Sequence, residues 1–490
     1  MRSFREKLGA LFISEQSFCS SSAVSGVCKL FLGIYGVLVC AILIWFAYTF
    51  VLVGDEREHL TASYYIYSGQ RPYIDFFEHH HPLMWYSFLP LLSLFDNVGY
   101  IWYVMRSYML FLIVLNCFVV YKITLLIAQN KFFSILSVFL SIASHCVFVA
   151  QITFRPDGLM SLLLLTGVYF FINYLQNKRN FMLHLAFMAF FLAFMALQKA
   201  LIFLFFIALL MLFLVYKKEL SFKSVVNALI LPIILYLLYL FYLYKIGALK
   251  DYWELNWLLN IKANYPFTYL IATTIYYYVA NGIAIVLLFT KQPKIIKYLS
   301  FLGIGFSISL FFLGTFVQYW IPLYSYFGII CAYVICRLKE KWQIFSVVLV
   351  IICTVANNLK YIHEQALFPK LQFFVAQSSK VVSLTNKGDK ILGNIKILGG
   401  LRPDVAGYYW FGRDYMALID SYYFNRHPLP DANRLLKEYK PKLISIDDWE
   451  ICINHDLSNN QNCYLRKGTF DKNYVQENYV RNGLFWIRKD

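Results

Sequence analysis

The segment from Val53 to Tyr86 contains the densest group of ionisable side chains in the first 360 residues of the chain. Asp55 and Glu56 stand side by side near its start, and three histidines, residues 79 to 81, stand near its end. The other members are Arg57, Glu58, His59, Arg71, Asp75 and Glu78. A carboxylate can take a proton from a reacting group and an arginine can hold an anion, so these residues could support proton transfer beside a bound anion.

This segment directly follows the first long apolar run, residues 30 to 53. A run of that length can cross a bilayer as a helix. The carboxylates of Asp55 and Glu56 are therefore expected at the membrane surface, where clustered ionisable groups indicate a functional site.

The composition predicts a polytopic α-helical membrane protein. Hydrophobic residues make up 60% of the chain, aromatic residues 19% and charged residues 14%, and the mean hydropathy is +0.57. The net charge of +17 does not indicate nucleic-acid binding, because lysines and arginines gather in short loops between apolar runs. The first run is too long for the core of a secretory signal, so we expect it to stay as an anchor.

The apolar runs predict about eleven transmembrane helices of roughly 17 to 25 residues. After the first, they fall near residues 99–121, 132–151, 158–175, 181–197, 200–216, 224–244, 267–290, 298–317, 320–336 and 342–359. Every second loop is basic, which predicts a cytosolic N-terminus, a large first exoplasmic loop and an exoplasmic C-terminus.

The composition changes near residue 360 to that of a soluble domain. We expect a transmembrane domain over residues 1–360 and a small C-terminal exoplasmic α/β domain over residues 361–490. Within the latter, Ile391 to Ile397 and Leu443 to Ile446 are predicted strands, and Asp431 to Tyr439 is a predicted helix with an Asp cap.

Two of the ten cysteines, Cys452 and Cys463, fall in this C-terminal segment. In an oxidising compartment they are expected to form a disulfide, and two separate buried thiols are the alternative.

Several motifs follow one another along this topology. Near the first span they are Asp55-Glu56, then Gly69-Gln70-Arg71-Pro72-Tyr73-Ile74-Asp75, then His81-Pro82-Leu83. Further along they are Arg155-Pro156-Asp157, Lys199, Tyr319-Trp320-Ile321-Pro322, Gly407-Tyr408-Tyr409 and Lys440-Pro441-Lys442-Leu443-Ile444. In this order the motifs resemble those of the type C glycosyltransferases, which include protein O-mannosyltransferases and the lipid A aminoarabinose transferase. The last two are similar to the small exoplasmic domain of many members.

The resemblance implies an enzyme that moves a sugar from a polyprenyl or dolichyl phosphate to an acceptor with inversion at the anomeric carbon. The phosphate is already a good leaving group, so the reaction needs one carboxylate to take the acceptor proton and cations around the phosphate. Asp55 is the expected base, and a helix-capping carboxylate is its structural alternative.

The roles of the neighbouring candidates stay open at the level of sequence. Glu56 is expected either to orient the acceptor or to pair with a basic group, and Asp157 either to join Asp55 or to pair with Arg155. Arg155 and Lys199 are the preferred phosphate partners. The reserves for the phosphate are Arg57, Arg71 and Lys262, and the expected acceptor or sugar contacts are Tyr73, Asp75, His81 and Tyr319.

The three adjacent histidines raise the alternative of a divalent metal site. They cannot all face one ion on a regular element, but two of them, such as His79 and His81, could do so with Glu78 or Asp75. Adjacent histidines lack the separated spacing of known sites, so we expect no required cofactor and keep metal binding as the lesser alternative.

The competing class is a polytopic lipid or solute transporter or flippase. Such proteins place their sites near the membrane midplane, often in internal repeats, whereas the ionisable groups here gather at the outer ends of spans. The expected partners are a polyprenyl-phosphate sugar, membrane lipids and an envelope glycan, lipid or protein acceptor. The expected location is a bacterial inner membrane with the active site facing the periplasm, and neither the sugar nor the acceptor is specified.

Overall fold

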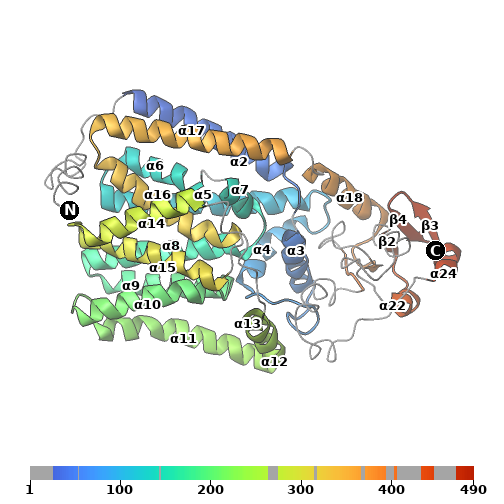
Figure 1. The fold of residues 1–490 in the computed structure, drawn as a ribbon. Coiled ribbons are helices and arrows are strands. Elements are labelled where there is room, and N and C mark those ends of the chain that lie inside the picture. The colour runs from blue at the N-terminus through green and yellow to red at the C-terminus, as the bar shows by residue number, and fades with distance from the viewer. Residues whose placement is uncertain are drawn as a thin grey trace. The chain divides into compact units, whose positions relative to one another are not determined.

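The computed structural model describes residues 26–52, 54–142, 145–262, 274–313, 317–365, 370–392, 402–405, 432–445 and 471–489. The chain forms two compact units that interleave along the sequence (Figure 1). The first unit comprises Met1–Phe50, Met109–Leu237 and Tyr265–Phe368. The second comprises Val51–Tyr108, Leu238–Asn264 and Pro369–Asp490. The domain boundary expected at residue 360 stays a prediction.

The first unit is a bundle of apolar helices. Its described elements are α2 (Gly26–Thr49), α5 (Ile101–Ala128), α6 (Lys131–Ile142), α7 (His145–Ile152), α8 (Pro156–Asn177), α9 (Asn180–Ala196), α10 (Ala200–Tyr216), α11 (Phe222–Lys245), α14 (Thr274–Phe289), α15 (Lys294–Leu313), the 3₁₀ helix η2 (Val317–Trp320), α16 (Ile321–Cys336) and α17 (Glu340–Gln365). Helices α5 and α11 continue into the second unit.

These helices follow the apolar runs of the sequence closely, except that the run near 132–151 forms two helices, α6 and α7. By length and composition, five described helices could cross a membrane: Lys29–Thr49, Ile101–Ala128, Pro156–Asn177, Phe222–Lys245 and Gln318–Cys336. Several others are apolar but shorter. The protein is therefore an integral membrane protein, and the total of about eleven spans stays a prediction.

Helix α16 lies at the centre of the first unit, and 94% of the apolar stretch that it forms with the end of η2, within Gln318–Cys336, is buried. It packs closely on α6, and a Cβ at Gly328 would overlap Ser141 and the backbone of Ser137. Small residues at such a contact let two helix backbones approach, which is the usual way in which membrane helices associate.

The second unit holds the remaining elements. They are α3 (Gly54–Tyr67), α4 (Leu83–Phe95), α12 (Leu249–Trp253), the π-helix η1 (Glu254–Leu259), α13 (Asn260–Lys262), α18 (Leu371–Leu384), β1 (Ile391–Leu392), α22 (Ala432–Tyr439), β2 (Leu443–Ser445), α24 (Lys472–Asn478), β3 (Tyr479–Asn482) and β4 (Phe485–Arg488). The expected first loop thus contains two helices, α3 and α4, which pack on each other.

The four strands form one sheet in the order β1-β2-β4-β3, with β1 parallel to β2 and the other pairs antiparallel. Neighbouring strand residues point to opposite faces. Leu392 and Ile444 therefore pack with α22 and α24 on one face, whereas Ile391 and Leu443 pack with Val381 of α18 on the other. The small α/β fold predicted from the sequence is present, although Asp431, the expected cap, and residues 393–397 lie outside the described residues.

Candidate active site

Asp55 lies half-buried in the first turn of α3, directly after the first apolar helix. Glu58 and His59 lie three and four residues further along, on the same face of the helix as Asp55. A carboxylate at this end of a helix also interacts favourably with the positive end of the helix dipole. The sequence of α3 thus brings two carboxylates and one imidazole to one side of the helix.

Glu56 points into a different environment. Its Oε2 accepts a hydrogen bond of 2.7 Å from Nη2 of Arg106 on α5, and both side chains have 0% exposure. Nη2 of Arg106 also donates to the carbonyl oxygen of Val51 at 3.2 Å. Of the two roles left open for Glu56, these contacts favour pairing with a basic group.

Arg57, a reserve for the donor phosphate, is buried as well. Its Nη2 donates to the carbonyl oxygen of Leu52 at 3.0 Å, and its guanidinium carbon lies 5.2 Å from the ring centre of Phe374. Burial lowers the pKa of Arg57 to about 10, partly opposed by the nearby charge of Glu56. The guanidinium therefore remains cationic at neutral pH.

The segment after α3 folds into a tight turn held by Arg71 and Asp75. The Arg71 guanidinium makes two bonds to the Asp75 carboxylate, of 2.9 and 3.0 Å, and this hydrogen bonding lowers the pKa of Asp75. The structure thus pairs two predicted ligand-binding residues with each other, at a solvent-exposed position. Their predicted contacts with phosphate and sugar stay predictions.

Tyr73, inside this turn, adopts a left-handed backbone with φ of 72°, which is unusual for a bulky residue. Its hydroxyl donates to the carbonyl oxygen of His80 at 2.9 Å and lies 3.3 Å from the Tyr239 hydroxyl. The ring is buried in a cluster that includes Phe77 and Tyr252. Tyr73 therefore holds the turn and the histidine segment together.

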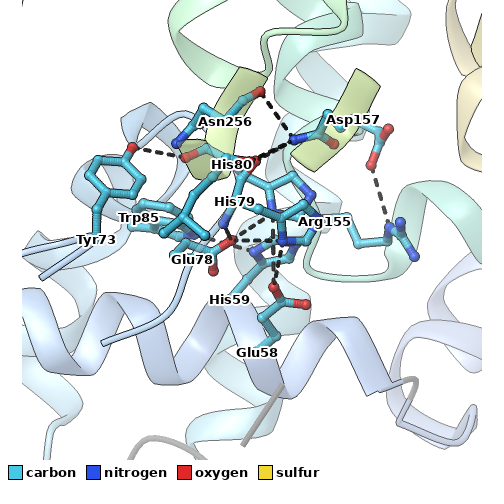
Figure 2. A network of polar contacts seen from close by, with 12 residues as sticks. Glu58, His59, Tyr73, Glu78, His79, His80, Trp85, Arg155, Asp157 and Asn256 are labelled. Atoms are coloured by element: carbon cyan, nitrogen blue, oxygen red, sulfur yellow. Dashed lines mark hydrogen bonds and ion pairs between the residues drawn. The ribbon is translucent and has the colours of Figure 1, made fainter. Parts of the chain in front are cut away.

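His79 and His80 lie with two carboxylates in one buried cluster, defined by Glu58, Glu78, His79 and His80 (Figure 2). One ligand atom from each residue lies within 4.8 Å of those of the others. Burial raises the pKa of the Glu78 carboxyl to about 8, and hydrogen bonds from the backbone of His79 and His80 and with Glu58 oppose that rise. We call this group the Glu58 cluster.

His81 does not join the Glu58 cluster. Its Nε2 lies 2.8 Å from the hydroxyl of Tyr252, and the two rings stack with centroids 5.6 Å apart. Asn260 meanwhile donates from its side chain to the carbonyl oxygen of His79 at 3.1 Å. Tyr252 of α12 and Asn260 of α13 therefore fix the histidine run, and His81 lies apart from the residues that could hold a metal ion together with His79.

Arg155 and Asp157 belong to the first compact unit, at the start of α8. Arg155 Nε lies 3.4 Å from Asp157 Oδ2, and the Asp157 side chain is 3% exposed (Figure 2). The pair lies at the helix N-terminus, where an acidic side chain is favoured. The structure thus shows the Arg155 pairing that the sequence left as one of two roles for Asp157.

Lys199 and Tyr319, also in the first unit, contact each other. The Lys199 ammonium donates to the Tyr319 hydroxyl and lies 4.5 Å from the centre of the Tyr319 ring. This is a cation–π geometry as well as a hydrogen bond. Two residues predicted on separate grounds, one for phosphate and one for sugar or acceptor, are therefore neighbours.

Some residues predicted for the site lie outside the described part of the chain, and the sequence did not single out others that lie beside it. Cys452 and Cys463 lie outside the described residues, as do the side-chain surroundings of Lys262. Trp85 and His59 were missed as site residues, and Trp85 Nε1 donates to His59 Nδ1 at 3.3 Å. Asn256 is buried on a π-helix, an element that often marks functional sites. The helical spacing of Asp55, Glu58 and His59 was the available sequence signal.

Over about three quarters of its length the chain has the fold of the type C glycosyltransferases. Two solved structures of ArnT, the lipid A aminoarabinose transferase, from Cupriavidus metallidurans carry this conclusion. The chain superimposes on ArnT bound to undecaprenyl phosphate with a TM-score of 0.54 and 11% identity, covering 74% of this chain and 71% of that one. For ArnT in the apo state the TM-score is 0.51 and the identity 12%, over 73% and 70% of the two chains.

The fold expected from the motifs is therefore confirmed. No protein-family model and no curated protein matches the chain. At such low identity the likeness establishes the fold alone, so the activity is argued from the residues below.

Proposed function

We propose that the protein transfers a sugar from a polyprenyl-phosphate donor to an acceptor at the exoplasmic membrane surface. The observation that carries this proposal is the likeness, over about three quarters of the chain, to a structure bound to undecaprenyl phosphate. Such a reaction needs a carboxylate and cations: Asp55 follows the first apolar helix, and Arg155 and Lys199 directly precede the apolar helices α8 and α10. A lipid-linked donor would reach them from the bilayer.

The proposed step is a single inverting displacement. The acceptor oxygen or nitrogen forms a bond to the anomeric carbon of the sugar as the bond from that carbon to the phosphate oxygen breaks. The bonding electrons leave with the polyprenyl phosphate, and Asp55 takes the proton from the acceptor. The phosphate leaves as a stabilised anion, so this step needs no general acid.

Arg155 and Lys199 are proposed to bind the donor phosphate. A guanidinium has five N–H donors, so a contact through Nε with Asp157 is compatible with an additional anion. Lys199 supplies a compact charge beside the Tyr319 hydroxyl, which is suited to the sugar or phosphate. Glu56 and Arg57 are assigned to support, because their contacts are with Arg106, a backbone carbonyl and Phe374.

The acceptor is proposed to be an envelope molecule, such as a lipopolysaccharide component, another glycan or a protein. A bacterial inner membrane with the site facing the periplasm fits the basic loops on the opposite side of the predicted spans. A mannosyltransferase-like specificity is one form of this proposal, and a donor series distinguishes it from the others.

The decisive experiment measures release of undecaprenyl phosphate by the purified protein in proteoliposomes. The donors are undecaprenyl-phosphate hexoses and an undecaprenyl-phosphate aminopentose, and envelope extracts supply acceptors. Asp55→Asn should lower transfer by roughly 100- to 10,000-fold, the usual contribution of a positioned general base. The matched control is Asp251→Asn, because Asp251 is also a half-buried acid in the first turn of a helix.

Full activity in Asp55→Asn would remove Asp55 as the base, with Asp157 the next residue to test. If no donor in the series is cleaved by the wild-type protein, the proposed activity is wrong. Movement of intact donor across the proteoliposome, without sugar release, would indicate a transporter instead.

A further inference from the structure

The Glu58 cluster combines two carboxylates and two imidazoles from segments about twenty residues apart in the chain. We infer that Glu58, Glu78, His79 and His80 bind one divalent metal ion such as Zn²⁺. The bound ion would link the histidine segment to α3. This goes beyond the proposed transfer reaction, because the metal would bind whether or not the sugar donor has been identified correctly.

The distances fit a four-coordinate site. With metal–ligand bonds of about 2.0–2.2 Å, ligand atoms in a tetrahedron lie roughly 3.3–3.6 Å apart. Nδ1 of His79 lies 3.6 Å from Oε1 of Glu58 and 3.8 Å from Oε1 of Glu78. Nδ1 of His80 lies 3.9 Å from the same Glu58 atom and 2.7 Å from the Glu78 atom. Adjustments of about an ångström would bring all four atoms to one ion.

The chemistry of the donors also indicates the class of metal. Two imidazole nitrogens and two carboxylate oxygens suit Zn²⁺ and its transition-metal neighbours, whereas Mg²⁺ and Ca²⁺ prefer oxygen ligands. Glu58, Glu78 and His79 have side chains no more than 1% exposed, and that of His80 is 10% exposed. Two carboxyl groups this deeply buried and close together do not readily ionise together in a low dielectric, and a bound dication would stabilise both as carboxylates.

The surroundings of the Glu58 cluster hold the ligands in place. The backbone N–H of His79 donates to Glu78 Oε1 at 2.9 Å, and Asn260 fixes the carbonyl of the same histidine. The His59 ring packs edge-on against the His80 ring with centroids 4.9 Å apart (Figure 2). Contacts of this kind orient metal ligands in known sites. A bound ion would thus also fix the helical turn that carries Asp55, one turn before Glu58.

The test begins with the full-length protein purified through a histidine-free tag and without chelators. Its zinc, manganese, cobalt, nickel and copper contents are measured by mass spectrometry, and about one equivalent of a single metal is expected. After chelation and dialysis, added Co²⁺ should produce the visible absorption of a tetrahedral nitrogen and oxygen site.

Two variants locate the ion. The double variant Glu58→Gln/His80→Ala should bind Co²⁺ at least 100-fold more weakly, because it replaces one carboxylate ligand with a neutral amide and removes one imidazole ligand. His81→Ala is the matched control, since His81 belongs to the same histidine run but contacts Tyr252. It should keep the metal. If the double variant fails to fold, X-ray absorption on the wild-type protein must show four nitrogen or oxygen ligands that include two imidazoles.

Three results would overturn the inference: a purified protein that holds no metal and takes up neither Zn²⁺ nor Co²⁺ at micromolar concentration, retention of the metal by the double variant, or X-ray absorption without two imidazoles. In the first case a proton shared by Glu58 and Glu78 holds the cluster together. Metal content is measured without any sugar donor, so its failure is distinct from failure of the proposed transferase activity.

Discussion

The buried pair of Glu56 and Arg106 makes a prediction that separates a structural acid from a catalytic one. Glu56→Gln keeps the size of the side chain and an oxygen that can accept from Arg106, but it removes the negative charge. Both side chains are fully buried, so the charge of Arg106 would then lack its carboxylate partner. Breaking one partner of a buried ion pair costs about 3–5 kcal/mol. We therefore expect a clear loss of stability in Glu56→Gln.

The size of the effect can be checked with a double-mutant cycle. Arg106→Met removes the cation and should destabilise the protein for the converse reason, since it leaves Glu56 as a buried anion. The double variant Glu56→Gln/Arg106→Met removes both charges, so its loss should be smaller than the sum of the single losses by about 0.5–3 kcal/mol. Unfolding is followed in detergent by urea or heat, with the helical signal and a size-exclusion profile as readouts.

Activity measurements on the same proteins complete the test. Under the structural assignment, Glu56→Gln molecules that remain folded should transfer sugar within a few-fold of the wild-type rate at low temperature. Wild-type stability combined with a rate loss of 100-fold or more would refute this reasoning and return Glu56 to the acceptor side of the mechanism. Additive single losses would show that Glu56 and Arg106 do not act as a pair.

Three further predictions address the donor, the topology and the α/β fold. Arg155→Ala and Lys199→Ala should each reduce the rate of sugar transfer from the donor by roughly 10- to 1000-fold, because a hydrogen bond to a charged group contributes about 1.5–3 kcal/mol and more in a dry site. Wild-type transfer rates in both variants would assign the two residues to packing instead. Reporter fusions after residues 180, 220, 295 and 360 should read cytosolic, cytosolic, cytosolic and exoplasmic, and a cytosolic signal from the last would remove the proposed placement of the site. Leu436→Ala should destabilise the α/β sheet region by about 2–5 kcal/mol, since Leu436 is fully buried in its core, and limited proteolysis would report it.

The helices of the first unit could be located from the sequence because a long apolar run has few alternatives to a helix in lipid. The run predicted at residues 200–216 is α10 with the same bounds, and that at 181–197 is α9 within one residue. The length of the run near 132–151 predicts one span, but the run forms two helices, α6 and α7.

The predicted first loop contained more structure than its composition suggested. Helix α3 has polar residues on its buried side, among them Glu56, Glu58 and His59, so the usual alternation of apolar and polar residues is absent. Its partner α4 is apolar but only 13 residues long and contains Pro90, which made it look like a loop segment. Helical periodicity cannot reveal a helix whose buried face is built from ion pairs and hydrogen bonds.

The candidate site shows the same limit at the level of single residues. Sequence patterns selected Asp55, Arg155 and Lys199 as ionisable groups beside apolar runs, but they could not say which acid pairs with which base. That choice depends on tertiary contacts, such as the approach of α18 to the start of α5. There a Cβ at Gly99 would overlap the backbone of Ser379, and Trp102 donates to Ser378 at 2.6 Å.

The histidine run illustrates how such contacts change an interpretation. On a regular strand, alternate residues share a face, which favours His79 with His81 over His79 with His80. The segment instead follows the left-handed turn at Tyr73 and has no regular strand geometry, so His79 and His80 face Glu58 while His81 faces Tyr252. The residues that could hold a metal ion therefore differ from those expected on a regular strand. The variant Tyr73→Gly separates two effects of this residue. Glycine adopts a positive φ readily, so the turn itself becomes easier to form. The Tyr73 hydroxyl contacts and ring packing are lost, however, so the Glu58 cluster should loosen.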